Sequence, residues 1–286
     1  MSRKALVLYA MIVSVSVNGC VTKTINSDGS IANKLDNKEK LSDTYTNLAS
    51  EYLNHNSLNL ALDRVNLAIA TNAYNYRAYM VRGTIYQYLN KPIEANNDFK
   101  YSLKLNNNYP DTYVNYGSFL CSIHNYDEAF NSFAIAINNS SYLSPEIAYY
   151  NRGRCYFLQN SFESANKDLL RSISYKHVPD GSYILLAALN YKQNNISLAK
   201  FYMDQFSGTQ SAESLWLHIQ ILSALIHQSN NPKNNRKYAS YINLLAQILL
   251  NDFKNSVEAQ QYIMLYGNVM PNEGYDFDAK DDINDY

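Results

Sequence analysis

The stretch YVNYGSFLCSIHNYDEAFNSFAIAIN, residues 113–138, decides the fold because it recurs along the chain. Shifted back by 34 residues it falls on YMVRGTIYQYLNKPIEANNDFKYSLKLN, residues 79–106, and shifted forward by 36 it falls on a segment that begins at Tyr149. Further copies begin at Tyr45 and Tyr183, and a weaker one at Trp216. In the five clear copies, a small residue follows the opening aromatic by four positions, and an alanine comes twelve positions later. The small residues are Ala49, Gly83, Gly117, Gly153 and Ala187, and the alanines are Ala61, Ala95, Ala129, Ala165 and Ala199.

These columns resemble the tetratricopeptide repeat, W-x2-L-G-x2-Y followed by A-x3-F, with tyrosine in place of tryptophan. In such a unit two antiparallel helices approach closely at the small residues. A single unit cannot bury its apolar face, so units must stack. We therefore predict an all-α fold, a right-handed solenoid of about six tetratricopeptide helix-turn-helix repeats over residues 41–268. The expected units lie near 42–75, 76–109, 110–145, 146–179, 180–212 and 213–268.

Turn and helix-start residues fit this division. Asn90, Asn125 and Asn160 suit tight turns between the two helices of a unit, because asparagine tolerates left-handed backbone angles. Pro92, Pro110 and Pro145 suit the first turn of a helix, where a missing N–H costs least; all three are placed there by the repeat. The last unit is degenerate: NNPKNNRK, residues 230–237, is expected to form an extended loop, and the unit to act as a cap.

Cys121, His124, Asp127 and Glu128 lie within eight residues of one another and could be taken for a catalytic cluster. They occupy ordinary repeat positions at the end of one helix and the start of the next, so we predict a scaffold role. The sequence has no HExxH, P-loop, GxSxG or paired CxxC motif. We therefore predict no catalytic residue, no metal and no cofactor. Cys121 and Cys155 fall in adjacent first helices; a disulfide and two separate buried thiols are both open, and we favour the thiols.

The N-terminus has the pattern of a signal peptide, residues 1–19. Arg3 and Lys4 precede an uncharged run, Ala5–Val17, that spans roughly 20 Å as a helix and is too short to cross a bilayer. The sequence VNGC that ends at Cys20 resembles a bacterial lipobox, which implies covalent lipid on Cys20, including a final acyl chain such as palmitate, and stable anchoring. The alternative is an ordinary secretory signal with an incidental cysteine. Residues 20–40 would form a flexible tether, and 269–286 an acidic disordered tail.

Location and partners follow from the same features. No Asp follows Cys20 directly, and by resemblance to sorted lipoproteins the chain is expected at the outer membrane, facing the oxidising periplasm. The chain has 24 basic and 25 acidic residues, which argues against nucleic-acid binding because such proteins carry a basic excess.

A lipobox, a short tether and about six repeats together resemble the type IV pilus pilotins, the PilF/PilW lipoproteins. The most specific match is NYGSFLC, Asn115–Cys121, followed by a two-residue insertion before the next unit. This resemblance implies a non-catalytic, monomeric partner of the type IV pilus secretin subunit. It would promote secretin targeting to the outer membrane and multimerisation during pilus biogenesis.

Repeat geometry predicts the binding surface. Positions 2, 5, 9 and 12 of each first helix should line a concave groove, with one tyrosine at its rim. The predicted groove residues are Arg77, Met80, Thr84, Gln87, Tyr88, Val114, Ser118, Cys121, Tyr150, Arg154 and Phe157.

Two other functions fit the same architecture. One is a periplasm-facing repeat scaffold that serves outer-membrane protein insertion, cell-wall synthesis or another secretion machine. The other is a peptidoglycan-active enzyme, which would need a carboxylate pair or metal cluster outside the repeat columns. The sequence shows no such cluster.

Overall fold

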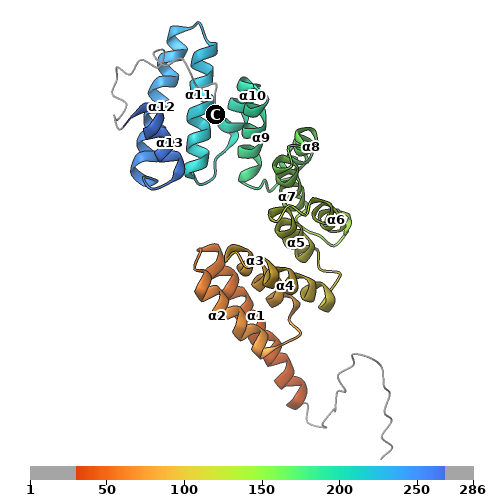
Figure 1. The fold of residues 1–286 in the computed structure, drawn as a ribbon. Coiled ribbons are helices and arrows are strands. Elements are labelled where there is room, and N and C mark those ends of the chain that lie inside the picture. The colour runs from red at the N-terminus through yellow and green to blue at the C-terminus, as the bar shows by residue number, and fades with distance from the viewer. Residues whose placement is uncertain (1–29, 268–286) are drawn as a thin grey trace, which may run out of the picture.

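The computed structural model describes residues 30–267, which form a curved array of helix pairs (Figure 1). Within that range the chain makes thirteen α-helices and no strand. The helices are α1 (Ser30–Asn54), α2 (Leu58–Thr71), α3 (Tyr76–Tyr88), α4 (Pro92–Leu105), α5 (Pro110–Ser122), α6 (Tyr126–Asn138), α7 (Pro145–Leu158), α8 (Phe162–Ile173), α9 (Gly181–Lys192), α10 (Ile196–Gln205), α11 (Ala212–Gln228), α12 (Pro232–Asp252) and α13 (Val257–Tyr266).

Successive helices pair as the repeat predicts: α1 with α2, α3 with α4, and so on to α11 with α12, with α13 added at the end. Units 1 to 5 are the pairs from α1/α2 to α9/α10. The first helix of each unit also contacts the first helix of the next unit, so the units stack side by side. The predicted all-α tetratricopeptide solenoid is confirmed.

The glycine column explains why the two helices of a unit fit so closely. A Cβ added at Gly117 would lie 2.9 Å from the ring of Phe133, and one added at Gly83 would lie 3.2 Å from the ring of Phe99. Both rings come from the second helix of the same unit and are fully or almost fully buried. The aromatic of the A-x3-F motif therefore fills the space that the missing side chain leaves.

Each turn inside units 1 to 5 contains one residue with left-handed backbone angles, at the same repeat position. These residues are Asn56, Asn90, His124, Asn160 and Asn194, with φ between 54° and 62°. The prediction for Asn125 was wrong: its φ is −85°, and it lies directly before α6 without a side-chain capping bond, while His124 takes the left-handed position. Pro92, Pro110 and Pro145 each begin a helix, as predicted.

Units 2 and 4 share a salt bridge that the others lack in the described part of the chain. The Arg82 guanidinium donates two hydrogen bonds to Asp98, at 2.6 and 2.9 Å, and Arg152 does the same to Asp168. Both pairs are largely shielded from water. In unit 3, Tyr116 occupies the repeat position that Arg82 occupies in unit 2. Its hydroxyl lies within hydrogen-bonding distance of Asn96 and Glu128.

One contact between neighbouring units also differs between alternate junctions. A serine hydroxyl in the second helix of units 2 and 4 donates to a carbonyl of its own unit and meets a hydroxyl of the next unit. The pairs are Ser102 with Thr112, at 3.2 Å, and Ser172 with Ser182, at 3.1 Å. The corresponding positions between units 1 and 2, and between units 3 and 4, hold fully buried alanines: Ala68 and Ala78, and Ala136 and Ala148. Hydroxyl pairs and alanine pairs therefore alternate at this one repeat position. The junction of units 1 and 2 has polar contacts elsewhere, because the buried Asn75 amide donates to Ser42 and Thr46.

The ends of the array differ from expectation in two places. Helix α1 begins at Ser30, so residues 30–40, expected to be part of the tether, are helical, and a Lys40–Asp36 ion pair one turn apart supports them. The expected loop at 230–237 is short, because α12 begins at Pro232 and the Asn231 side chain caps it by accepting from two backbone N–H groups. The signal peptide, Cys20 and the acidic tail lie outside the described residues. Within 30–267, no helix combines the length and apolar character needed to cross a bilayer.

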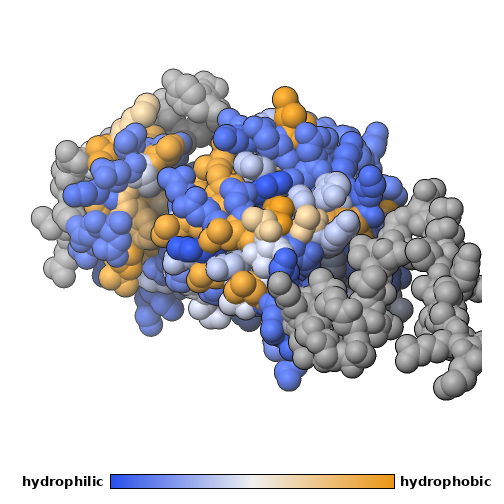
Figure 2. All heavy atoms as spheres, turned by 90° about the horizontal axis from the view of Figure 1, so that it is seen from below, coloured by the Kyte–Doolittle hydropathy of each residue, from blue (hydrophilic) through white to orange (hydrophobic). Residues whose placement is uncertain are grey.

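Apolar side chains also reach the surface. Figure 2 shows them gathered in a band across the face seen from below, among hydrophilic ones. On the first unit, four leucines are 37–45% exposed: Leu41, Leu48, Leu60 and Leu67.

Candidate binding groove

The first helices of units 2, 3 and 4, namely α3, α5 and α7, line a groove of about 840 Å³. A second hollow of about 570 Å³ adjoins it on the side of unit 1, and the two share Thr84, Tyr88 and Asn115. The groove is long enough to involve three units. Its volume lies within the range of small-molecule sites, but its extent across three units also suits an extended polypeptide segment.

The structure places most of the predicted groove residues at these hollows. Six of the eleven line the larger one: Thr84, Gln87, Tyr88, Ser118, Tyr150 and Arg154. Met80 lines the adjoining hollow. Burial raises the pKa of Tyr150, while the nearby Arg154 charge partly opposes that shift. The Tyr150 hydroxyl therefore remains protonated at neutral pH and can act as a hydrogen-bond donor.

Four predicted residues lie elsewhere. Val114 is 2% exposed and packs in the core, and Cys121 is bonded to another cysteine, so both predictions were wrong. Arg77 turns toward unit 1, where it donates to Asn47 and lies 3.8 Å from Asp43. Phe157 packs against Phe162 instead of lining the groove. The causes differ: packing between units involves Val114 and Cys121, a polar contact with unit 1 turns Arg77 away, and Phe157 contacts a ring of its own unit.

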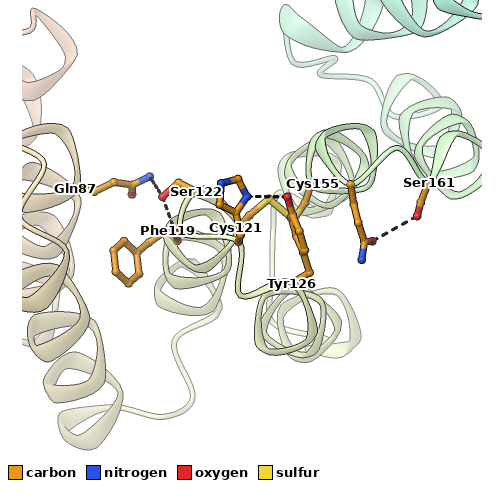
Figure 3. Close-up of a disulfide and its surroundings, with 9 residues drawn as sticks. Gln87, Phe119, Cys121, Ser122, Tyr126, Cys155 and Ser161 are labelled. Carbon is orange, nitrogen blue, oxygen red and sulfur yellow. Dashed lines mark hydrogen bonds between the residues drawn. A yellow bond between two sulfur atoms is a disulfide. The ribbon is translucent and has the colours of Figure 1, made fainter.

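Cys121 and Cys155 form a disulfide between α5 and α7, with their Cα atoms 5.8 Å apart (Figure 3). The sequence left this pairing open and favoured free thiols, which was wrong. The two cysteines lie in first helices that are direct neighbours in the stack, so their Cα atoms come within bonding range. On the other side of α5, the Gln87 amide donates to Ser122 at 3.4 Å. The helices that carry the groove are thus joined to one another by a covalent link and by side-chain contacts.

Several groove residues were missed from the sequence. They are Asn90, Pro92, Asn115, Phe119, Ser122, Ile123 and Asn151. Asn115 and Asn151 were within reach of the repeat argument, because they occupy the same position in units 3 and 4. Each directly follows a residue that was predicted to line the groove, Val114 or Tyr150. The groove wall therefore includes more positions on each helix than the four that were considered.

The cluster of Cys121, His124, Asp127 and Glu128, which the sequence analysis assigned to the scaffold, makes contacts with neighbouring side chains. His124 Nδ1 lies 2.9 Å from the Tyr126 hydroxyl, and Glu128 accepts hydrogen bonds from Asn125 and Tyr116. Burial and the neighbouring Glu128 carboxylate raise the pKa of Tyr116. Cys121 has no thiol to act as a nucleophile, since it is in the disulfide. Among residues 30–267, no group of three His, Cys, Asp or Glu side chains is placed to hold a metal ion.

The stacked helix pairs and the groove along their first helices define the class: this is a tetratricopeptide-repeat protein, as its similarity to solved structures also shows. A tetratricopeptide repeat protein from Parabacteroides merdae superimposes with a TM-score of 0.57 at 16% identity, covering 78% of this chain and 83% of that one. No protein-family model matches the sequence.

Two type IV pilus proteins are similar over almost their whole length. PilW, described as a widely conserved type IV pilus biogenesis factor, superimposes with a TM-score of 0.63 at 27% identity, covering 78% of this chain and 98% of PilW. PilF of Pseudomonas aeruginosa superimposes with a TM-score of 0.62 at 21% identity, covering 80% of this chain and 99% of PilF. An uncharacterized protein of Haemophilus influenzae is 23% identical over 171 residues, which is 59% of this chain and 91% of that protein.

Proposed function

We propose that this chain is a non-catalytic outer-membrane lipoprotein of type IV pilus biogenesis, a pilotin that binds the secretin subunit. The observation that carries the proposal is the similarity to PilW, which spans 98% of that protein at 27% identity. The groove across units 2 to 4 supports it, because a scaffold that accompanies another protein needs an extended surface for a segment of that protein.

The lipid anchor is the second part of the proposal. The sequence VNGC places Cys20 where lipoproteins carry their acyl chains, ten residues before α1 begins. An anchor and a groove on one chain act as two linked modules. Once the lipid is in the outer membrane, the bound secretin subunit is held at a high local concentration beside the same membrane. Ring assembly would then be promoted without any catalytic step.

The test is deletion of the gene followed by analysis of secretin in membrane extracts. We expect detergent-resistant secretin multimers to be lost or strongly reduced and to return with the wild-type gene. Normal multimers in the deletion strain would rule out the pilotin role and favour a scaffold for another envelope machine.

The anchor is tested separately with Cys20→Ala. This variant should keep its helical circular dichroism spectrum, fail to incorporate labelled palmitate and leave the outer-membrane fraction. The double variant Cys121→Ser, Cys155→Ser is the matched control, because it removes two cysteines and keeps Cys20. Labelled palmitate on the Cys20→Ala protein would contradict the anchor.

A further inference from the structure

The two adjoining hollows carry one formal charge between them, on Arg154. Their other lining residues are amides, hydroxyls, tyrosines and apolar groups, and no Asp or Glu lines either hollow. A groove with this composition attracts a negative group and has no carboxylate to neutralise a positive one.

The Arg154 guanidinium is free for a ligand. Within the described part of the chain it makes no hydrogen bond and no ion pair, and its side chain is exposed at the groove. The three other arginines on α3 and α7 each have a carboxylate nearby: Arg82 and Arg152 donate two hydrogen bonds each to an aspartate, and Arg77 lies 3.8 Å from Asp43. Arg154 therefore differs from its neighbours in having no carboxylate of its own. A guanidinium binds a carboxylate through two parallel N–H···O bonds.

Two asparagines give the groove a regular spacing. Asn115 on α5 and Asn151 on α7 occupy the same repeat position, 36 residues apart, and neither side-chain amide bonds another residue within 30–267. Each lies one helical turn before Ser118 or Arg154 on the same helix. An amide side chain can donate to and accept from a peptide main chain. Packed helices are about 8–10 Å apart, which equals about three residues of an extended chain.

Contacts between helices hold the side chains of the groove in place. The disulfide joins α5 to α7 at the groove end of both helices, so the distance between the two asparagines is restrained. Tyr150 packs against Gly181 at the start of α9, where any added side chain would collide with it, and this fixes the wall beside Arg154. Tyr88 and Ile123, which are 65% and 44% exposed, provide apolar surface at the rim.

We propose that the groove binds an extended segment of a partner protein that carries an acidic side chain. Arg154 binds the carboxylate through two hydrogen bonds, Asn115 and Asn151 bind the main chain on either side of the unit boundary, and Tyr88 and Ile123 contact apolar side chains. The chemistry of the site follows from the groove alone; only the identification of the source as the secretin rests on the proposed function.

The test uses the full-length lipoprotein in detergent and two dye-labelled, capped peptides with the sequences TVDVT and TVNVT, which favour extended conformations and differ by one charge. Fluorescence anisotropy should show at least tenfold tighter binding of TVDVT, and added salt should reduce this preference. Arg154→Gln should bring both affinities to the same value. Arg236→Gln, an exposed arginine on α12 far from the groove residues, is the charge-matched control and should keep the preference.

Asn115→Ala and Asn151→Ala should each weaken both peptides by the same factor, because their bonds go to the main chain. Equal binding of the two peptides by the wild type, or a preference that survives Arg154→Gln, would overturn the proposal. The acidic tail, residues 269–286, is a competing occupant. If neither peptide binds the full chain and both bind after the tail is removed, the groove belongs to the tail and the assignment to a partner is wrong.

Comparing the peptide assay with the deletion strain separates this proposal from the proposed function. If the peptides behave as expected but deletion of the gene leaves secretin multimers normal, the acidic-segment site stands and the secretin is not its source. If multimers require the gene and the peptides do not discriminate, the pilotin role stands and the site is wrong.

Discussion

At the scale of single residues, the left-handed turn position shows how a repeat tolerates an unusual residue. Asparagine holds this position in four units, and His124 holds it in unit 3 with φ of 62°. Left-handed angles cost most residues about 1–2 kcal/mol, and asparagine less. His124 offsets part of this cost through its contact with Tyr126.

Substitutions at this position should therefore follow backbone preference. We expect His124→Asn to raise the free energy of unfolding by about 0.5 kcal/mol and His124→Val to lower it by about 1–2 kcal/mol. His227→Val is the control, because His227 is exposed within the right-handed helix α11 and should lose only a few tenths of a kcal/mol. Urea unfolding measures all three. A Val variant as stable as the Asn variant would contradict the account.

A second residue gives a dependence on pH. His218 on α11 is buried against Tyr241 with its Nε2 atom unpaired, and burial lowers its pKa to about 4. The nearby groups are Asp204, which favours the charged form, and Lys200, which opposes it. In the unfolded chain the pKa is about 6.5, so the unfolded state binds the proton first as pH falls.

The folded state should therefore lose up to about 3 kcal/mol as pH drops from 6.5 to 4, with no further loss from this group below that. The variant His218→Phe keeps an aromatic ring against Tyr241 and removes the titrating nitrogen. Thermal unfolding at a series of pH values should give a smaller slope in this window for the variant than for the wild type. Identical slopes would show that His218 is not the cause.

At the scale of helices, the sequence predicted most of the fold because the physical reason for each column is local. Three kinds of residue allow a local prediction: a glycine that faces a buried ring, a proline in the first turn of a helix, and an asparagine in a tight turn. The groove was predicted less well, since Val114 is buried in the apolar cluster that joins units 2 to 4, and Phe157 contacts Phe162 of its own unit. The disulfide depends on the same packing, and the sequence gives no distance between Cys121 and Cys155.

The disulfide should contribute strongly to stability. It closes a loop of 34 residues between α5 and α7. Restricting such a loop in the unfolded chain is worth about 3–4 kcal/mol. The variant Cys121→Ser, Cys155→Ser should lose about this much in denaturant unfolding, and wild-type protein with reductant should match it. If oxidised and reduced wild type unfold at the same denaturant concentration, the bond does not stabilise the fold.

At the scale of the whole molecule, the array has several apolar clusters instead of one central core. One cluster is centred on units 2 to 4 and includes Phe119 and Leu120; another joins α11, α12 and α13 around Leu249 and Tyr262. Since each unit contacts mainly its neighbours, a local defect should remain local.

We expect Leu249→Ala to cost about 2–5 kcal/mol and to raise amide hydrogen exchange in α11–α13 while leaving α3–α6 unchanged. Leu120→Ala is the matched control, because it removes an equally buried leucine from the other cluster and should have the reverse effect. Exchange mapped by mass spectrometry reports both. Faster exchange throughout the chain in either variant would mean that the array unfolds as one unit.

The alternation of hydroxyl and methyl contacts between neighbouring units has a consequence for how such an array can grow. If α3 and α4 alone were duplicated, Ser102 of the first copy would face Ala78 of the second copy. Ser102 would then lose the hydroxyl partner that Thr112 provides. Copying units 2 and 3 together would place Ala136 against the copied Ala78 and would keep a Ser102–Thr112 pair in each copy. At this contact, duplication of two units preserves the partner of every hydroxyl, whereas duplication of unit 2 alone does not.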